Sequence, residues 1–208
     1  VTVSSLLRDA GYRTFLSGKW HLGSGDKFGP IARGFDRAFT LVSGGASHYA
    51  DMRPSYAPSP EIKANYWEDG VKLSELPDTF VYSSEYYVDR MIDYLGADDS
   101  TDDPFFAYLS FTAPHWPLQA PDEAIARQQG KFDAGYDIHA TQRLARMKEL
   151  GLIPEEAERS GRSPKETAWE ELNGEQRKTE IRAMEVYAAM VAEVDVHMGR
   201  LLNFLQTK

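Results

Sequence analysis

The chain has 208 residues, which is enough for a domain with a hydrophobic core of its own. Hydrophobic side chains make up 42% and aromatic side chains 12% of the sequence, and this composition excludes disorder of the chain as a whole. The net charge of -9 argues against nucleic acid as a partner, because phosphate binding needs clustered Lys and Arg. A few cations focused in one cleft can still bind a small anionic substrate.

Three absences narrow the chemistry further. The sequence contains no cysteine, so it offers no disulfide, thiolate metal site or cysteine nucleophile. No apolar run approaches the roughly 18 residues that a membrane-spanning helix needs. Residues 1–7 lack the charged start and apolar core of a signal peptide, and the first residue is not Met. We therefore expect the chain to begin inside a larger protein, for which a periplasmic or secreted location stays open.

The first predicted elements are a helix and a strand. Residues 4–10 fit the end of an amphipathic helix, and Gly11 suits the left-handed position that follows a helix. Residues 12–17 then read as a buried strand that ends at Gly18. Residues 24–80 are rich in Gly, Pro and aromatic residues and show no clear periodicity, which is typical of a folded functional loop region.

A second helix and strand follow. Apolar residues at helical spacing predict a helix from Ser83 or Ser84 to about Leu95. After an acidic loop at 98–104, residues 105–111 form a nearly continuous apolar run, as expected of a strand buried on both faces. Helix, strand, loop, helix, strand and loop in this order predict an α/β sheet.

The last third of the chain is predicted to be helical. Residues 136–150 form one amphipathic helix, and the polar residues 154–174 are expected to run over the surface. Residues 175–206 predict a single long amphipathic helix that packs on a sheet rather than in a coiled coil. His139 and His197 lie on these helices, and we expect a structural or exposed role for both.

The first segment whose side chains could take part in catalysis is Gly18-Lys19-Trp20-His21-Leu22-Gly23. In extended backbone, Lys19 and His21 point to the same side, with roughly 6–7 Å between their Cα atoms, and Trp20 points to the other. One face would then present an ammonium and an imidazole together. Spacing alone favours a simpler interpretation, a strand end with a solvated Lys and a packed His.

The second segment is Thr112-Ala113-Pro114-His115-Trp116-Pro117-Leu118. Two prolines restrict the backbone around His115, which places this imidazole well for proton transfer or contact with an anion. A rigid loop whose His bonds a backbone carbonyl explains the pattern equally well. Both segments follow predicted strands, and ligands of open α/β sheets bind at the carboxyl ends of the strands.

Together these segments resemble the sulfatase family, which belongs to the alkaline-phosphatase-like superfamily. The family's second signature corresponds to residues 11–23, and a further motif corresponds to residues 113–118. Weaker similarity to the arylsulfatase branch is spread over residues 33–39, 44–49 and 147–154. The resemblance implies an alkaline-phosphatase-like α/β fold, with a central, mostly parallel sheet flanked by helices and truncated at both ends.

The resemblance also implies an activity and its residues. Sulfatases hydrolyse sulfate esters with a formylglycine nucleophile and a Ca²⁺ or Mg²⁺ ion. Lys19 matches the lysine that bridges sulfate and formylglycine, and His21 matches the histidine bonded to the formylglycine hydrate, a general base. His115 matches the histidine near the leaving-group oxygen, which is a candidate acid and also contacts sulfate. Ser47 or His48 is expected to line the substrate pocket.

The sequence also departs from the family pattern. Formylglycine is made from Cys or Ser in a Cys/Ser-x-Pro-x-Arg motif, and this chain has neither version of the motif. The family's Asp-Asn metal ligands and its C-terminal lysine are also missing, and the pairs Asp98-Asp99 and Asp102-Asp103 read as a solvated loop. We therefore assign no metal ligand. We expect residues 1–208 to be the central part of a sulfatase catalytic domain, inactive alone, with the nucleophile and metal segment and a C-terminal segment outside it.

Two other functions remain possible from the sequence. One is hydrolysis of phosphonate or phosphate esters by a member of the same superfamily. The other is binding of sulfated glycans by a non-catalytic relative. In each case the expected partner is a small-molecule or glycan ester, without nucleic acid or a membrane span.

Overall fold

The computed structural model describes residues 1–56, 59, 61–97, 103–163 and 167–207, which form two compact units. One unit comprises Val1–Pro121 and Met190–Lys208, and the other comprises Asp122–Ala189. The long helix α6 (Gly174–Thr207) contributes residues to both units. The first unit contains all the residues predicted to form the site.

A five-stranded sheet organises the first unit, in the order β4-β3-β2-β1-β5. Strand β1 pairs in parallel with both β2 and β5, whereas β3 and β4 are antiparallel additions at one edge. The strands are β1 (Arg13–Lys19), β2 (Arg37–Leu41), β3 (Tyr66–Glu68), β4 (Val71–Lys72) and β5 (Phe105–Ser110). The predicted α/β class and the shared direction of the first and last strands are confirmed.

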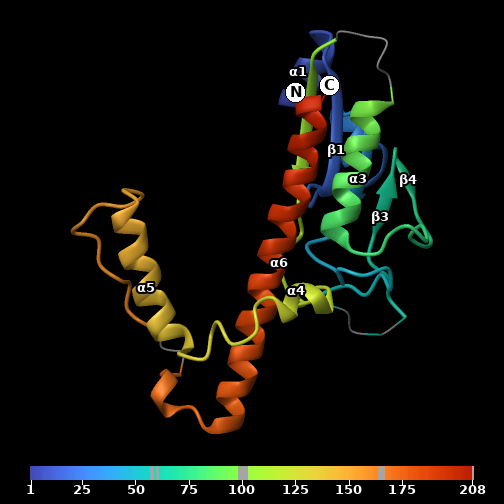
Figure 1. The fold of residues 1–208 in the computed structure, drawn as a ribbon. Helices are drawn as coiled ribbons and strands as arrows, with labels where there is room; N and C mark the ends of the chain where they lie inside the picture. The colour runs from blue at the N-terminus through green and yellow to red at the C-terminus, as the bar shows by residue number, and fades with distance from the viewer. Residues whose placement is uncertain (57–58, 60, 98–102, 164–166, 208) are drawn as a thin grey trace. The chain divides into compact units, whose positions relative to one another are not determined.

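Alternation along the strands produces two apolar layers. Phe15 and Phe39 pack on one side of the sheet with α3 (Ser83–Gly96), whose Tyr87 and Met91 are fully buried. Figure 1 shows α3 lying along β1. The next residue of β1, Leu16, packs on the opposite side in a smaller cluster. The central strands are therefore held from both faces.

Strand β5 differs from its prediction. The sequence predicts burial on both faces, but Phe105 is 41% and Tyr108 46% exposed. The strand stands at one edge of the sheet order, with β1 as its only neighbour among the described strands. A strand in that position lacks part of the cover that an interior strand has.

The predicted helices are confirmed within one or two residues. They correspond to α1 (Val3–Asp9), α3, α5 (Gly135–Glu149) and α6. In the first unit, Leu201 and Phe204 of α6 join the main core, so this part of the helix packs on the sheet layer as predicted. His197 is buried in the same part of α6, with Nε2 3.4 Å from Glu193 Oε2.

Residues 24–80 are more regular than their sequence suggests. They contain α2 (Gly25–Phe28), the 3₁₀ turn η1 (Ile31–Arg33) and the strands β2, β3 and β4. These strands are two to five residues long, too short for a periodic pattern to emerge. In the acidic loop, Asp103 is exposed, whereas residues 98–102 lie outside the described residues.

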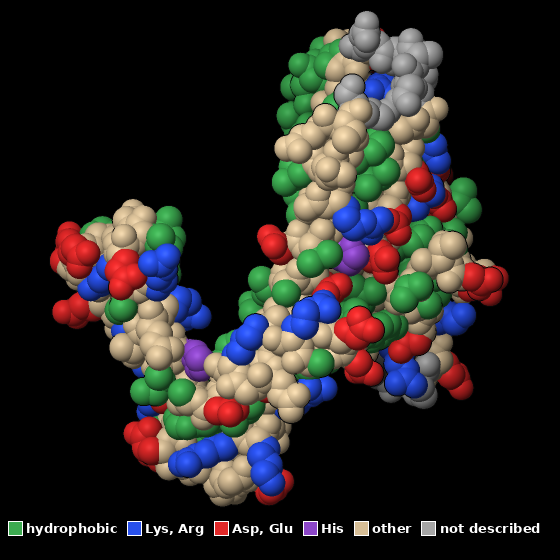
Figure 2. All heavy atoms as spheres, in the orientation of Figure 1, with side chains coloured by type: hydrophobic (Ala, Val, Ile, Leu, Met, Phe, Trp, Pro, Cys, Tyr) green, Lys and Arg blue, Asp and Glu red, His purple; other side chains and the backbone are tan. Residues whose placement is uncertain are grey.

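The second unit is built from short and long helices. It contains α4 (Asp122–Ala126), α5, the 3₁₀ turn η2 (Trp169–Glu171) and the first half of α6. Asp137 accepts from Arg159 at 2.7 Å and Arg162 at 2.8 Å, and these hydrogen bonds lower the pKa of its carboxyl to about 2. Figure 2 shows acidic and basic side chains interspersed over the visible surface. Within the described ranges, no helix combines the length and apolar character needed to cross a membrane.

Candidate active site

The carboxyl ends of β1 and β5 are in close contact at Gly18 and Ser110. Gly18 has a φ of 119°, and a Cβ atom added to it would lie 1.9 Å from the Ser110 carbonyl oxygen. The Ser110 hydroxyl donates to the Lys19 carbonyl at 2.6 Å. Only glycine allows this close approach, and it sets half-buried Lys19 beside the end of β5.

The backbone changes conformation after Lys19. Trp20 still donates from its backbone N–H to Leu41 O at 2.9 Å, and its indole donates to Phe28 O at 2.9 Å. His21 has a φ of 55°, in the left-handed region, and its N–H donates to Val42 O at 3.2 Å. The extended geometry assumed in the sequence prediction therefore does not extend to His21, whose side chain is exposed.

Two adjacent glycines each lie close to one of the imidazoles, although 94 positions separate His21 and His115 in the sequence. A Cβ atom added at Gly44 would lie 3.0 Å from His21 Cε1. A Cβ atom added at Gly45 would lie 2.9 Å from His115 Cε1 and 3.0 Å from its Nδ1. Gly44 therefore leaves space for the His21 ring, and Gly45 leaves space for the His115 ring.

A backbone carbonyl fixes the tautomer of His115. Its Nδ1 lies 2.5 Å from the Trp116 carbonyl oxygen, which can only accept a hydrogen bond. Nδ1 therefore carries the proton in the neutral ring, and Nε2 is the nitrogen that can take up or release one. The carbonyl bond considered in the sequence is thus present, and it is compatible with proton transfer at the other nitrogen.

His48 is fully buried and bridges two segments. Its Nε2 lies 2.9 Å from the His115 carbonyl oxygen, so Nε2 must carry hydrogen. Its Nδ1 lies 2.8 Å from Ser83 Oγ at the start of α3 and accepts the hydroxyl proton in the neutral ring. Burial lowers the pKa of His48 below its usual value of 6.5, which favours that neutral form. His48 has 0% of its surface exposed and stabilises the His115 loop through the hydrogen bond to the His115 carbonyl.

Ser47 is also buried and shares a partner with His48. The Gln119 side-chain oxygen accepts from the His48 backbone N–H at 2.8 Å and lies 3.2 Å from Ser47 Oγ. Both residues therefore tie the 44–49 segment to the end of the His115 loop. In the described structure neither Ser47 nor His48 has a side chain accessible to a substrate, because Ser47 is only 2% exposed and His48 is fully buried.

Three participants are missing from the sequence prediction: the glycine pair Gly44-Gly45, Ser83 and Gln119. The glycines lie inside the weakly similar stretch 44–49, where their identity could have indicated a close approach. Gln119 directly follows the His115 motif. Ser83 gives no signal beyond that of a helix start, because its contact with His48 depends on the tertiary fold.

A metal ion and a formylglycine are the two groups that the family resemblance implies. Among the described residues, no group of three or more His, Cys, Asp or Glu side chains could hold a metal ion. The sequence also lacks the motif from which formylglycine is made. The described residues therefore supply neither a cluster of metal ligands nor the precursor of formylglycine.

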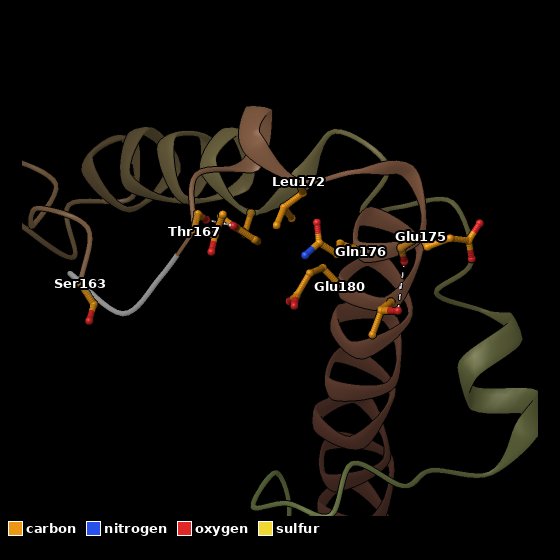
Figure 3. Close-up of a pocket in the computed structure, with 8 residues that line it drawn as sticks. Ser163, Thr167, Leu172, Glu175, Gln176 and Glu180 are labelled. Atoms are coloured by element: carbon orange, nitrogen blue, oxygen red, sulfur yellow. Dashed lines mark hydrogen bonds between the residues drawn. The ribbon is translucent and has the colours of Figure 1, made fainter.

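A large hollow lies in the second unit. It has a volume of about 730 Å³, and Glu175 and Glu180 are among the residues that line it. Figure 3 shows Thr167, Leu172, Gln176 and Glu180 around it, whereas the Glu175 side chain points away from them. The described residues of the lining include no lysine or arginine, which suits an anionic sulfate ester poorly, so the region of His21 and His115 in the first unit is the better candidate.

Comparison with known proteins identifies the family. The family model for sulfatases matches residues 1–208. The chain belongs to the sulfatase family. It is 42% identical to an arylsulfatase of Klebsiella aerogenes over 205 residues, which cover 99% of this chain and 43% of the relative. It is 40% identical to an uncharacterized sulfatase of Schizosaccharomyces pombe, covering 97% of this chain and 37% of that protein. The chain thus spans less than half the length of these relatives.

Solved structures share the fold of this sulfatase chain. Ps i-CgsB, crystallised in complex with k-i-k-neocarrahexaose, matches with a TM-score of 0.61 and 23% identity over 98% of this chain and 36% of its own. A structure solved in complex with its substrate D-glucosamine-2-N,6-O-disulfate matches with a TM-score of 0.57 and 19% identity over 98% of this chain and 46% of its own. The predicted alkaline-phosphatase-like fold is confirmed, with the central sheet flanked by helices.

Proposed function

We propose that the protein containing this chain hydrolyses sulfate esters and that Lys19, His21 and His115 belong to its active site. The packing of the His21 ring against Gly44 and of the His115 ring against the adjacent Gly45 is the observation that supports this most. Membership of the sulfatase family and 42% identity to an arylsulfatase support the reaction class.

Lys19 is proposed to supply positive charge to the site that contains the two imidazoles. A sulfate ester carries one negative charge, and more charge develops on the leaving oxygen as the S–O bond breaks. A fixed ammonium group stabilises such charge most in a site from which water is partly excluded. Lys19 is half-buried at the end of β1, so its backbone position is set by the sheet.

His115 is proposed as the acid that protonates the leaving alcohol or phenol. Its Nδ1 is held by the Trp116 carbonyl, which orients Nε2 for proton transfer. His48 and Ser47 are proposed to act on the substrate pocket through the loop that they hold rather than by contact. The role that the family gives His21, contact with the formylglycine hydrate, stays a prediction.

Sulfatases in general use formylglycine and a divalent metal ion. For this protein we propose the same pair, with Ca²⁺ or Mg²⁺ as the metal, held by residues other than those described. The proposed substrate is a small-molecule or glycan sulfate ester. One of the solved relatives was in complex with its substrate D-glucosamine-2-N,6-O-disulfate, and another was in complex with the oligosaccharide k-i-k-neocarrahexaose.

The test is turnover of 4-nitrophenyl sulfate and 4-nitrophenyl phosphate by the whole protein. We expect the sulfate ester to be hydrolysed, and Lys19→Ala to lower kcat/KM by at least about 10²-fold, as removal of one electrostatic stabiliser typically does. The matched control is Lys72→Ala. It removes an exposed lysine of β4, the strand at the edge of the sheet opposite β5.

The outcomes separate the three candidate functions. Preference for the phosphate ester would indicate a phosphoesterase, and binding of sulfated sugars without turnover would indicate a glycan-binding relative. Equal effects of Lys19→Ala and Lys72→Ala would contradict the place of Lys19 in the site.

A further inference from the structure

Two large aromatic side chains lie exposed next to His115. Trp116 is 47% exposed and Tyr56 is 72% exposed. Their ring centroids are 4.6 Å apart, and the planes are inclined by 79°, so the edge of one ring meets the face of the other. Edge-to-face pairs of this kind are favourable, and this one leaves much of both rings accessible.

The pair is attached to the histidine cluster through Ser55. The Ser55 hydroxyl donates to the Trp116 carbonyl at 3.0 Å, the same oxygen that His115 Nδ1 contacts. The Ser55 backbone N–H donates to Gly45 O at 3.1 Å. Gly45 is also the residue over which the His115 ring lies. Tyr56, Trp116 and His115 are thus held by one small set of contacts.

The position of the pair suggests what it binds. Sulfate itself offers no flat or apolar surface, whereas the phenol or sugar released from an ester does. An exposed aromatic face binds such a ring by stacking, and water is released from both surfaces. Because Trp116 follows His115 directly, a ring on this surface would hold its ester oxygen near the proposed acid.

We propose that Tyr56 and Trp116 form an aromatic platform that binds the ring of the leaving group in ring-containing sulfate esters. This inference rests on the proposed function and adds a specificity determinant to it. Lys19 recognises the sulfate that all substrates share, and the platform distinguishes ring-containing esters from simple alkyl sulfates.

The experiment compares the whole protein with the double variant Tyr56→Ala/Trp116→Ala. For 4-nitrophenyl sulfate we expect KM to rise about tenfold, the loss that a stacking contact of roughly 1.4 kcal/mol gives. The KM of propyl sulfate, which has no ring, and the inhibition constant of inorganic sulfate should change less than about twofold. Tyr187→Ala, which removes an aromatic side chain 49% exposed on α6, is the matched control.

Two further measurements keep the outcomes distinct. The pair Tyr56→Phe/Trp116→Phe should restore most of the affinity, since it keeps both aromatic faces. Calorimetric titration with 4-nitrophenyl sulfate, at concentrations and times that limit turnover, reports ring binding directly. Unchanged ring affinity in the alanine double variant would overturn the platform, as would equal weakening of inorganic sulfate. Ring binding without any turnover in the parent protein would instead remove the proposed function and leave the platform standing.

Discussion

His48 links a helix start to the backbone of the proposed acid through both of its ring nitrogens. Replacing it by Phe keeps a ring of similar size but leaves the Ser83 hydroxyl and the His115 carbonyl without this partner. Each buried polar group left unpaired costs about 1–3 kcal/mol, so we expect His48→Phe to lower the free energy of unfolding by about 2–4 kcal/mol. Urea unfolding measures this, and a loss below about 0.5 kcal/mol would contradict the bridging role.

The same histidine should make stability depend on pH. The folded protein holds the pKa of His48 below 6.5, so the unfolded chain binds the proton first as pH falls. Its stabilising contribution is therefore fully present above about pH 6.5 and declines below that value. His197 has a lowered pKa for the same reason, burial, and contributes with the same sign.

The comparison between parent and His48→Phe isolates the His48 share of this effect. The difference in their unfolding free energies should be largest near pH 8 and should shrink toward pH 5, since the variant retains His197 but has no titrating group at position 48. Urea unfolding at several pH values gives the difference. A constant value from pH 8 to pH 5 would show that His48 takes no part.

The proposed acid role of His115 can be tested with leaving groups that differ in their need for a proton. An alkyl or sugar alcohol leaves as an unstable alkoxide unless an acid protonates it, whereas nitrophenol leaves readily as its anion. In the whole protein, His115→Ala should lower kcat/KM for a sugar sulfate by about 10²–10⁴-fold through the loss of the acid. The loss for nitrophenyl sulfate should be much smaller and should reflect weaker sulfate binding alone. Measuring both esters in both variants separates the two effects. Equal losses on nitrophenyl sulfate and sugar sulfate would mean that His115 binds sulfate and is not the acid.

At the scale of the elements, the β1–β5 contact depends on one glycine. Gly18 and Gly11 both have positive φ, but an added Cβ would overlap the Ser110 carbonyl only at Gly18, and nothing lies within 4 Å of one at Gly11. Gly11→Ala should cost about 1–2 kcal/mol from its backbone conformation alone. Gly18→Ala should cost more than about 3 kcal/mol, because the two strands must separate. Equal losses in urea unfolding would contradict the close approach.

Elements with a strong pattern could be predicted from the sequence, and short ones could not. The apolar runs of β1 and β5 and the helical spacing of α3 and α6 predict bounds within one or two residues of those observed. Strands β3 and β4 have three and two residues and leave no pattern of their own, because β3 depends on pairing with β2 and β4 on pairing with β3. The exposure of Phe105 could not be predicted either, because an apolar run does not tell whether a strand lies at an edge.

At the scale of the molecule, the motifs located the residues of the candidate site but not how they are supported. Lys19, His21 and His115 stand in sequence signatures with few alternatives. His48 contacts Ser83 and His115 across 35 and 67 positions, which only the folded chain brings together. The left-handed backbone of His21 depends likewise on its contact with Val42. The sulfatase family model spans both compact units, so the resemblance extends beyond the unit that carries these residues.

The most direct test of the proposed site is a crystal structure of the whole protein with a slowly hydrolysed sulfate ester bound. We expect sulfate oxygens at about 2.7–3.2 Å from both Lys19 Nζ and His115 Nε2, the range of charge-assisted hydrogen bonds. The His21 ring should line the same cavity. A sulfate ester bound at another place, with Lys19 and His115 pointing away from it, would contradict the assignment.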